Sequence, residues 1–174
     1  AMSAAFIQDR QRLQRLFVDA MRYLMVVFIP VMVVIVMLAQ PLVLHIYKET
    51  WIDAVWPLRM LAIGLPFLFL HYPVGYLLNA ANRQTRNTIN IAITVVANIG
   101  VNLIFIQQFS YRSVAVISVA SSALLLLLGL IAARQVISLS GRELLITLGK
   151  TIVAGLFLAG IGNLLVPMIS NLPS

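Results

Sequence analysis

The stretch LAQPLVLHIYKETWIDAVWPLRMLA, residues 38–62, connects two long apolar segments through a short turn. The first segment ends near Gln40-Pro41, and the second begins at Trp56-Pro57. Proline suits the first turn of a helix, where N–H groups have no intrahelical partner, and tryptophan is enriched where a membrane meets water. The stretch therefore predicts a helix–loop–helix at one membrane surface. Its turn carries charges of both signs, on Lys48, Glu49 and Asp53.

The composition of the whole chain agrees with this interpretation. Of its 174 residues, 61% are hydrophobic and only 10% are charged, whereas soluble domains have about 25% charged residues. Several apolar runs are continuous over about 20 residues, the length that crosses the ~30 Å hydrocarbon core of a bilayer as an α-helix. The expected fold class is all-α integral membrane, with the lipid bilayer as the surrounding partner.

About five membrane-spanning helices are expected, preceded by an N-terminal amphipathic helix. The apolar residues of the lead-in recur at helical spacing, and a lipid-binding basic helix is the alternative function for it. The chain divides into the amphipathic lead-in over 1–22, four spans over 23–137, and a linker with one additional span over 138–174. The five spans are expected at about 23–39, 56–78, 88–107, 113–133 and 150–169.

Prolines and one short connection shape these spans. Pro30 should kink the first span, and Gln40-Pro41 should break or bend it near its end, because proline lacks an N–H and crowds the preceding turn. Pro66 and Pro73 should make the second span irregular. The connection over 108–112 is so short that the third and fourth spans should form a tight antiparallel hairpin.

The basic residues predict the orientation of the chain. The net charge is +7, which in a soluble protein would point to nucleic acid, but the basic residues lie in loops beside the spans, where they set orientation. No nucleic-acid partner is therefore expected. Five spans place nine basic residues on one side and three on the other, so the N-terminus is expected in the cytoplasm and the C-terminus outside. The nine are Arg10, Arg12, Arg15, Arg22, Arg83, Arg86, Arg134, Arg142 and Lys150, and the three are Lys48, Arg59 and Arg112.

Polar residues inside the expected spans are the candidates for a substrate pathway. Asn90, Thr94, Asn98 and Asn102 recur every four residues and therefore form one polar stripe along the third span. Amides in hydrocarbon need partners, so the stripe should face other helices or a wet cavity. The sequence favours neither of two roles for this stripe, the lining of a substrate pathway and hydrogen bonding between packed helices. Further candidates are Asn79, His71 and the cation Arg59.

The sequence offers no catalytic, metal or cofactor site. Its five acidic residues lie in expected loops or in the lead-in helix, away from the mid-membrane depth where a proton or sodium relay would want one. His45 and His71 fall on different segments and do not have the spacing of a metal pair. No phosphate loop or HExxH motif occurs. We therefore expect a protein that is not an enzyme.

Several short motifs occur along residues 8–137 at the ends and starts of the expected spans. They are Pro41-Leu42-Val43, Ile46-Tyr47, Trp51, Ala54, Leu58-Arg59-Met60-Leu61, Leu77-Leu78-Asn79-Ala80-Ala81-Asn82-Arg83-Gln84, Asn98 with Val101-Asn102-Leu103-Ile104, and Ser113-Val114-Ala115-Val116-Ile117-Ser118. These motifs resemble the polysaccharide-flippase family of the multidrug/oligosaccharidyl-lipid/polysaccharide exporter superfamily. The chain departs from that family after the short hairpin turn, where Tyr111-Arg112-Ser113 replaces the usual glycine.

This resemblance implies a flippase of two helical lobes around a central cavity, with the chain as a C-terminal portion and residues 23–137 as a four-helix part of one lobe. It implies export of undecaprenyl-pyrophosphate-linked oligosaccharide or polysaccharide units across the bacterial inner membrane. The implied partners are the lipid-linked glycan and the remaining lobe, without a cofactor. A drug or metabolite exporter of the same superfamily and a polytopic glycan-processing enzyme are the alternatives.

Overall fold

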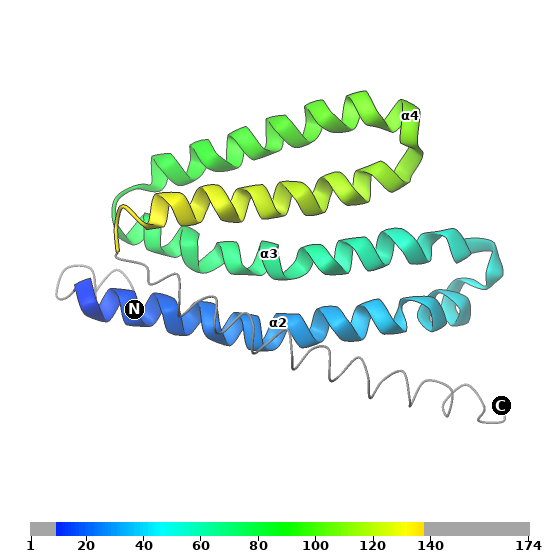
Figure 1. Ribbon diagram of the computed structural model, residues 1–174, viewed down its shortest axis with the longest axis horizontal. Coiled ribbons are helices and arrows are strands. Elements are labelled where there is room, and N and C mark those ends of the chain that lie inside the picture. The colour runs from blue at the N-terminus through cyan, green and yellow to red at the C-terminus, as the bar shows by residue number, and fades with distance from the viewer. Residues whose placement is uncertain (1–9, 138–174) are drawn as a thin grey trace.

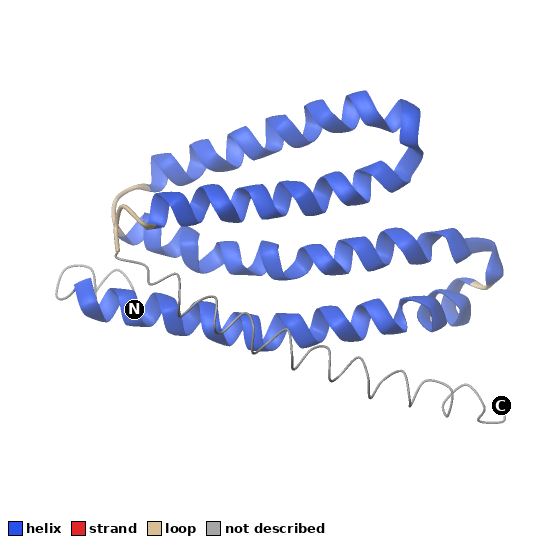
Figure 2. Ribbon diagram, in the orientation of Figure 1, coloured by secondary structure: helices blue, strands red, loops and turns tan. Residues whose placement is uncertain are grey.

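The computed structural model describes residues 10–137, which form three long α-helices and one short 3₁₀ helix (Figures 1 and 2). Helix α2 covers Arg10–Tyr47, η1 covers Glu49–Ala54, α3 covers Val55–Ala80 and α4 covers Gln84–Ala133. No strand occurs within these residues. The expected all-α fold is confirmed for this part of the chain, and the expected span over 150–169 lies outside the described residues.

Helix α2 joins the expected lead-in and first span into one helix of 38 residues. Its buried face continues the spacing predicted for the lead-in, with one buried side chain every fourth residue: Leu13, Phe17, Met21, Met25 and Ile29. Of the two effects expected of Gln40-Pro41, a break or a bend, the break does not occur, because α2 contains both Pro30 and Pro41 and continues to Tyr47. A membrane helix tolerates an internal proline when neighbouring groups satisfy the freed backbone carbonyls.

Helix α3 is the central element of the bundle. It matches the expected second span within two residues at each end, and it lies between α2 and the second half of α4 (Figure 1). Small residues on α3 allow the backbone of α4 to approach α3 closely. A methyl group added at Gly64 would lie 3.3 Å from a methyl carbon of Val119 on α4. Small residues at helix contacts are the usual means of close packing in membranes, where apolar burial does not itself drive helix association.

Helix α4 contains the expected hairpin, but its connection is not a loop. The backbone is helical from Gln84 to Ala133 and reverses direction at one end of the bundle (Figure 1). The two arms that are long and apolar enough to cross a membrane are Gln84–Ile106 and Tyr111–Ala133, called here the first and second arms. The residues between them include neither glycine nor proline, so no residue there removes a backbone donor or favours φ above zero.

The turn between α3 and α4 has a specific backbone geometry. Asn82 adopts a left-handed conformation with φ 57°, which asparagine tolerates better than most residues. The Arg83 N–H donates to the Leu78 carbonyl at 2.8 Å, and the Asn82 N–H donates to the Asn79 carbonyl at 3.1 Å. This pair of bonds is the Schellman arrangement that ends many helices, and it reverses the chain within three residues.

Four helical segments in the described part of the chain are long and apolar enough to cross a membrane. The charged residues gather at the two ends of this bundle. One end, called here the Arg83 end, carries the α3–α4 turn and the beginning of α2, and the other, the η1 end, carries η1 and the bend of α4 (Figure 1). Among the described residues, seven arginines belong to the Arg83 end and three basic residues to the η1 end.

Replacing Gly129 by alanine tests the close contact between α3 and α4. The added methyl group would lie 2.8 Å from a methyl carbon of Val74 and 3.3 Å from His71 Nδ1. Val74 is fully buried and, being β-branched, has little freedom to move. We expect Gly129→Ala to destabilise the intact protein by about 1–3 kcal/mol, as overpacking does, measured by thermal unfolding in detergent.

Gly100→Ala is the matched control, because nothing lies within 4 Å of the methyl group it would add. Alanine is the better helix former by about 1 kcal/mol, so this variant should be neutral or more stable. Equal unfolding midpoints for the two variants would contradict the close packing of α3 against the second arm.

Candidate substrate-pathway site

The polar stripe of the first arm faces the second arm. Asn98 donates from Nδ2 to the Ser121 hydroxyl at 2.8 Å, a bond that joins the two arms. Asn102 Nδ2 donates back along the helix to the Asn98 carbonyl at 2.9 Å and to Asn98 Oδ1 at 3.1 Å. The Thr94 hydroxyl donates to the Asn90 carbonyl at 2.9 Å. Interhelical bonding, one of the two roles open to the stripe, is therefore present in the structure.

The stripe also has hydrogen-bonding capacity that no described residue uses. Asn90 is 9% exposed, and its Nδ2 has no partner within residues 10–137, nor has Oδ1 of Asn102. Buried polar groups are nearly always hydrogen-bonded in folded proteins. The two amides therefore present one donor and one acceptor to whatever polar group reaches them.

His71 lies at the same depth in the bundle as one end of the stripe. The arms are antiparallel and Asn98 lies opposite Ser121, so Asn90, two turns earlier, should lie level with Gly129, two turns later. Gly129 in turn borders His71 Nδ1, a buried atom without a partner among the described residues. The structure thus places His71 of α3 at the level of Asn90, on the side of the bundle toward the Arg83 end.

The other two candidates lie elsewhere. Arg59 is half-buried near the η1 end, where its Nε donates to the Val36 carbonyl of α2 at 3.1 Å. Asn79 is exposed in the last turn of α3 at the Arg83 end. The seven candidates therefore do not form one cluster. Asn90, Thr94, Asn98 and Asn102 lie along the first arm, His71 lies on α3 beside Gly129 of the second arm, and Arg59 and Asn79 lie at opposite ends of α3.

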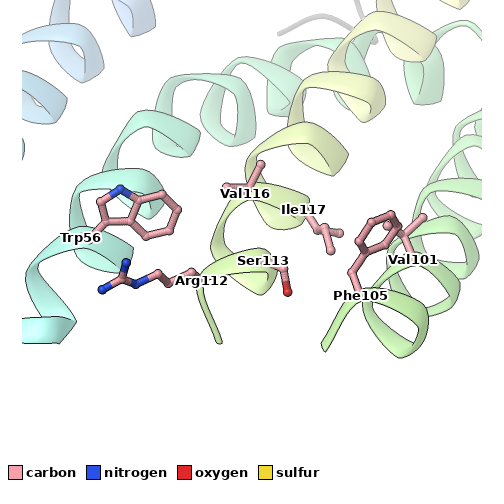
Figure 3. A pocket seen from close by; sticks show the side chains of 7 residues that line it. All are labelled: Trp56, Val101, Phe105, Arg112, Ser113, Val116 and Ile117. Carbon is pink, nitrogen blue, oxygen red and sulfur yellow. The ribbon is translucent and has the colours of Figure 1, made fainter. Parts of the chain in front are cut away.

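Two adjoining pockets at the η1 end were not expected from the sequence. A polar pocket of about 240 Å³ is lined by Gln40, Asp53, Trp56, Arg59 and Arg112. A second, apolar pocket of about 500 Å³ shares Trp56 and Arg112 with it and continues between the arms of α4 along Val101, Phe105, Val116 and Ile117 (Figure 3). The charged turn over 48–53 was the sequence feature that could have indicated the polar pocket. Nothing in the sequence, however, predicts that Arg112 lies beside this turn.

An exposed ion pair crosses between the turn and the bend of α4. An Nη of Arg112 lies 3.5 Å from Oδ1 of Asp53, and their side chains are 57% and 75% exposed. Exposed pairs of this kind contribute about 0–1 kcal/mol. The pair therefore joins η1 to the bend without neutralising the pocket strongly.

A third pocket, of about 560 Å³, lies between α2 and α3. It is lined largely by aromatic side chains, and Phe28 and Phe69 stack beside it with ring centroids 3.7 Å apart. Its lining includes Tyr23, Tyr72 and Tyr76, whose rings are largely exposed. Aromatic rings with a polar tip suit the membrane–water interface, so this groove is a surface feature of the Arg83 half.

Comparison with models of known protein families shows to which family the chain belongs. The family model for the lipid II flippase MurJ matches residues 1–171, nearly the entire chain. The chain belongs to this family. No curated protein and no solved structure shows a significant match.

Membership in the MurJ family confirms the broader part of the expectation and leaves the finer part unconfirmed. The multidrug/oligosaccharidyl-lipid/polysaccharide exporter superfamily is confirmed, as is a multi-pass bacterial inner-membrane transporter of a lipid-linked glycan that is not an enzyme. The polysaccharide-flippase family within that superfamily is not confirmed. The motifs that carried the resemblance are short and hydrophobic. Such motifs reflect the common demands of membrane packing and do not separate related families.

A double-mutant cycle tests the bond between the arms. Asn98→Ala and Ser121→Ala should each destabilise the intact protein, and their combined effect should be smaller than the sum by about 0.6 kcal/mol, the average for interhelical hydrogen bonds in membranes. The measurement is the free energy of unfolding in mild detergent.

Asn98→Ala combined with Thr88→Ala is the control pair. The Thr88 hydroxyl donates only within its own helix, to the Gln84 carbonyl, so these two effects should add within about 0.3–0.5 kcal/mol. Additive effects for Asn98 and Ser121 as well would show that the bond contributes nothing.

Proposed function

We propose that this chain supplies helices of a transporter that flips lipid II across the bacterial inner membrane by alternating access. The match to the lipid II flippase family over residues 1–171 carries the proposal. The four apolar segments and the hydrogen-bonded stripe between the arms of α4 support it. Flipping needs no covalent chemistry, only a route along which polar groups replace the hydration of the sugar and pyrophosphate.

The proposed pathway contacts come from the stripe and its neighbours. Asn90, Asn98 and Asn102 offer neutral amides, the groups that hydrogen-bond hydroxyl-rich sugars without the cost of burying a charge. The unpartnered atoms of Asn90, Asn102 and His71 are the ones such a substrate would engage as the arms separate. Thr94 adds a hydroxyl to the stripe. Asn79 and Arg59 lie away from the stripe, at opposite ends of α3, and Arg59 is the cation among these candidates that would attract a pyrophosphate.

A second lobe is the proposed protein partner. Large apolar side chains cover the outer faces of α2 and the first arm, including Val26, Val27, Val96, Leu103 and Ile104, each more than half exposed. Exposed apolar surface of this extent in a membrane helix faces lipid or another helix bundle. In alternating access one bundle rocks against another around the substrate site, so we propose that part of this surface meets the remaining lobe.

Undecaprenyl-pyrophosphate-linked polysaccharide units are the second candidate substrate, supported by motifs such as Leu58-Arg59-Met60-Leu61 and Val101-Asn102-Leu103-Ile104. The intact protein would be expressed in cells depleted of their own lipid II flippase. Restored exposure of lipid II at the outer face, with unchanged surface polysaccharide, supports the proposal. Failure to expose lipid II there, with restored polysaccharide export in cells that lack their own polysaccharide flippase, would replace it with the second candidate. A drug or metabolite exporter would restore neither.

Asn98→Leu combined with Asn102→Leu tests the pathway contacts. We expect this double variant to lose flipping while still inserting into the membrane, because leucine is favourable at mid-membrane but cannot hydrogen-bond a glycan. The assay is lipid II exposure at the outer face in depleted cells, with the amount of membrane-inserted protein measured in parallel. Val96→Leu with Ile99→Leu, two exposed apolar positions on the same arm, is the control and should flip normally. Normal flipping by the asparagine double variant would remove the stripe from the pathway.

We further propose that the Arg83 end faces the cytoplasm, because the described residues place seven arginines there and three basic residues at the other end. The sequence has no cysteine, so single cysteines report orientation directly. A membrane-impermeant thiol reagent should label Thr50→Cys in intact spheroplasts and Thr85→Cys only after permeabilisation. Both positions are exposed in the structure, and the reverse labelling pattern would invert the orientation.

A further inference from the structure

The two adjoining pockets at the η1 end form one amphipathic site. The polar part is built from residues of α2, η1, α3 and the α4 bend, and the apolar part opens between the two arms of α4. Trp56 and Arg112 line both parts, and Figure 3 shows them on neighbouring helices beside the apolar side chains. A ligand that filled both parts would therefore have a polar head and an apolar tail.

The polar part carries an excess of positive charge. Arg59 and Arg112 line it together with one carboxylate, that of Asp53. Asp53 pairs with Arg112 only at 3.5 Å and in an exposed position. Arg59 donates its hydrogen bond to a neutral group, the Val36 carbonyl. Within residues 10–137, the ion pair between Arg112 and Asp53 is the only salt bridge. The pocket thus holds two guanidinium groups against one carboxylate.

A half-buried guanidinium without a counter-charge is costly in a membrane protein. A bound anion would lower that cost, and arginine favours phosphate because its planar fork matches two phosphate oxygens. The contact with Val36 uses Nε of Arg59, which leaves its two terminal nitrogens to donate to such an anion. The position agrees with a headgroup, since tryptophan and arginine at a helix end are typical of the membrane–water interface.

We propose that this site binds one membrane phospholipid with an anionic headgroup. Its phosphodiester lies between Arg59 and Arg112, and one acyl chain occupies the apolar part along Val101, Phe105, Val116 and Ile117. A free phosphate would satisfy only the polar part, whereas an anionic phospholipid satisfies both parts and can enter from the surrounding leaflet. The bound lipid would join η1 to the bend of α4, which the exposed ion pair joins only weakly. This assignment gives Arg59 to the phospholipid in place of the pyrophosphate contact proposed for it above, and it does not depend on which glycan is transported.

The test compares three probes on the intact protein purified in detergent: phosphatidylglycerol, phosphatidylcholine with the same acyl chains, and inorganic phosphate. Binding is read from native mass spectra and from the concentration dependence of the unfolding temperature. We expect phosphatidylglycerol to bind in preference to phosphatidylcholine, and inorganic phosphate to bind far more weakly. Equal binding of the two lipids would contradict the preference for an anionic headgroup. Inorganic phosphate binding as tightly as phosphatidylglycerol would contradict the proposal that the ligand is a lipid.

Paired arginine variants locate the site. Arg59→Gln with Arg112→Gln should weaken phosphatidylglycerol binding by about tenfold or more, a loss of about 1.4 kcal/mol for each tenfold step. Arg83→Gln with Arg86→Gln is the matched control, because it removes the same charge at the opposite end, where both guanidiniums donate to the Gln135 side-chain oxygen. Equal weakening by the two double variants would show attraction by net charge rather than a site at the η1 end.

Two further variants separate binding from folding. Arg59→Lys retains the charge but lacks the fork, so it should bind phosphatidylglycerol with intermediate strength and unfold normally without lipid. Val116→Trp should fill the apolar part from a position that is 47% exposed, weakening lipid binding while leaving the weak response to inorganic phosphate unchanged. Unaltered lipid binding in Val116→Trp would overturn the placement of the acyl chain.

Discussion

Polar groups inside a membrane must find their partners within the protein, and the arrangement of the α4 hairpin depends on this constraint. Asn98 reaches Ser121 across the arms, and Asn102 and Ser122 bond within their own arms. An amide turned toward lipid would lose these partners at a cost of several kcal/mol. The stripe therefore fixes the rotation of the first arm about its axis, and Val96 and Leu103 consequently point outward.

The same constraint explains why α3 is central. Membrane helices gain little from apolar burial against one another, so close contact between small residues and neighbouring side chains supplies much of the attraction. Gly64 admits Val119, and Gly129 admits Val74 and His71. These approaches hold the second arm against α3, while α2 packs on the opposite side through Leu13, Phe17 and Met21, all nearly or fully buried. The described bundle is thus three helices in contact with α3 as the shared element.

The two ends of the bundle differ in chemistry. At the Arg83 end, Arg83 and Arg86 share the neutral side-chain oxygen of Gln135, and the beginning of α2, whose sequence is rich in arginine, lies at the same end (Figure 1). At the η1 end, fewer charges are combined with Trp56 and adjoining polar and apolar pockets. This difference between the two ends suits a transporter of a lipid-linked glycan, because each end meets a different leaflet of the membrane. The hydrogen-bonded stripe lies between the two ends, along the route that the substrate would follow.

The sequence by itself determined the fold class, the four described spans and the polar stripe, because span length and helical periodicity are local properties that the bilayer enforces. It also indicated the superfamily, although its short apolar motifs named a different family within it. It did not show that α2 continues through Pro41 or that the bend of α4 stays helical, because neighbouring helices decide whether a locally weakened helix persists. Only the tertiary structure placed Asn98 against Ser121, His71 beside Gly129, and Arg112 beside Asp53 and Trp56. Such contacts depend on how helices rotate and approach one another, which residue spacing along the chain does not encode.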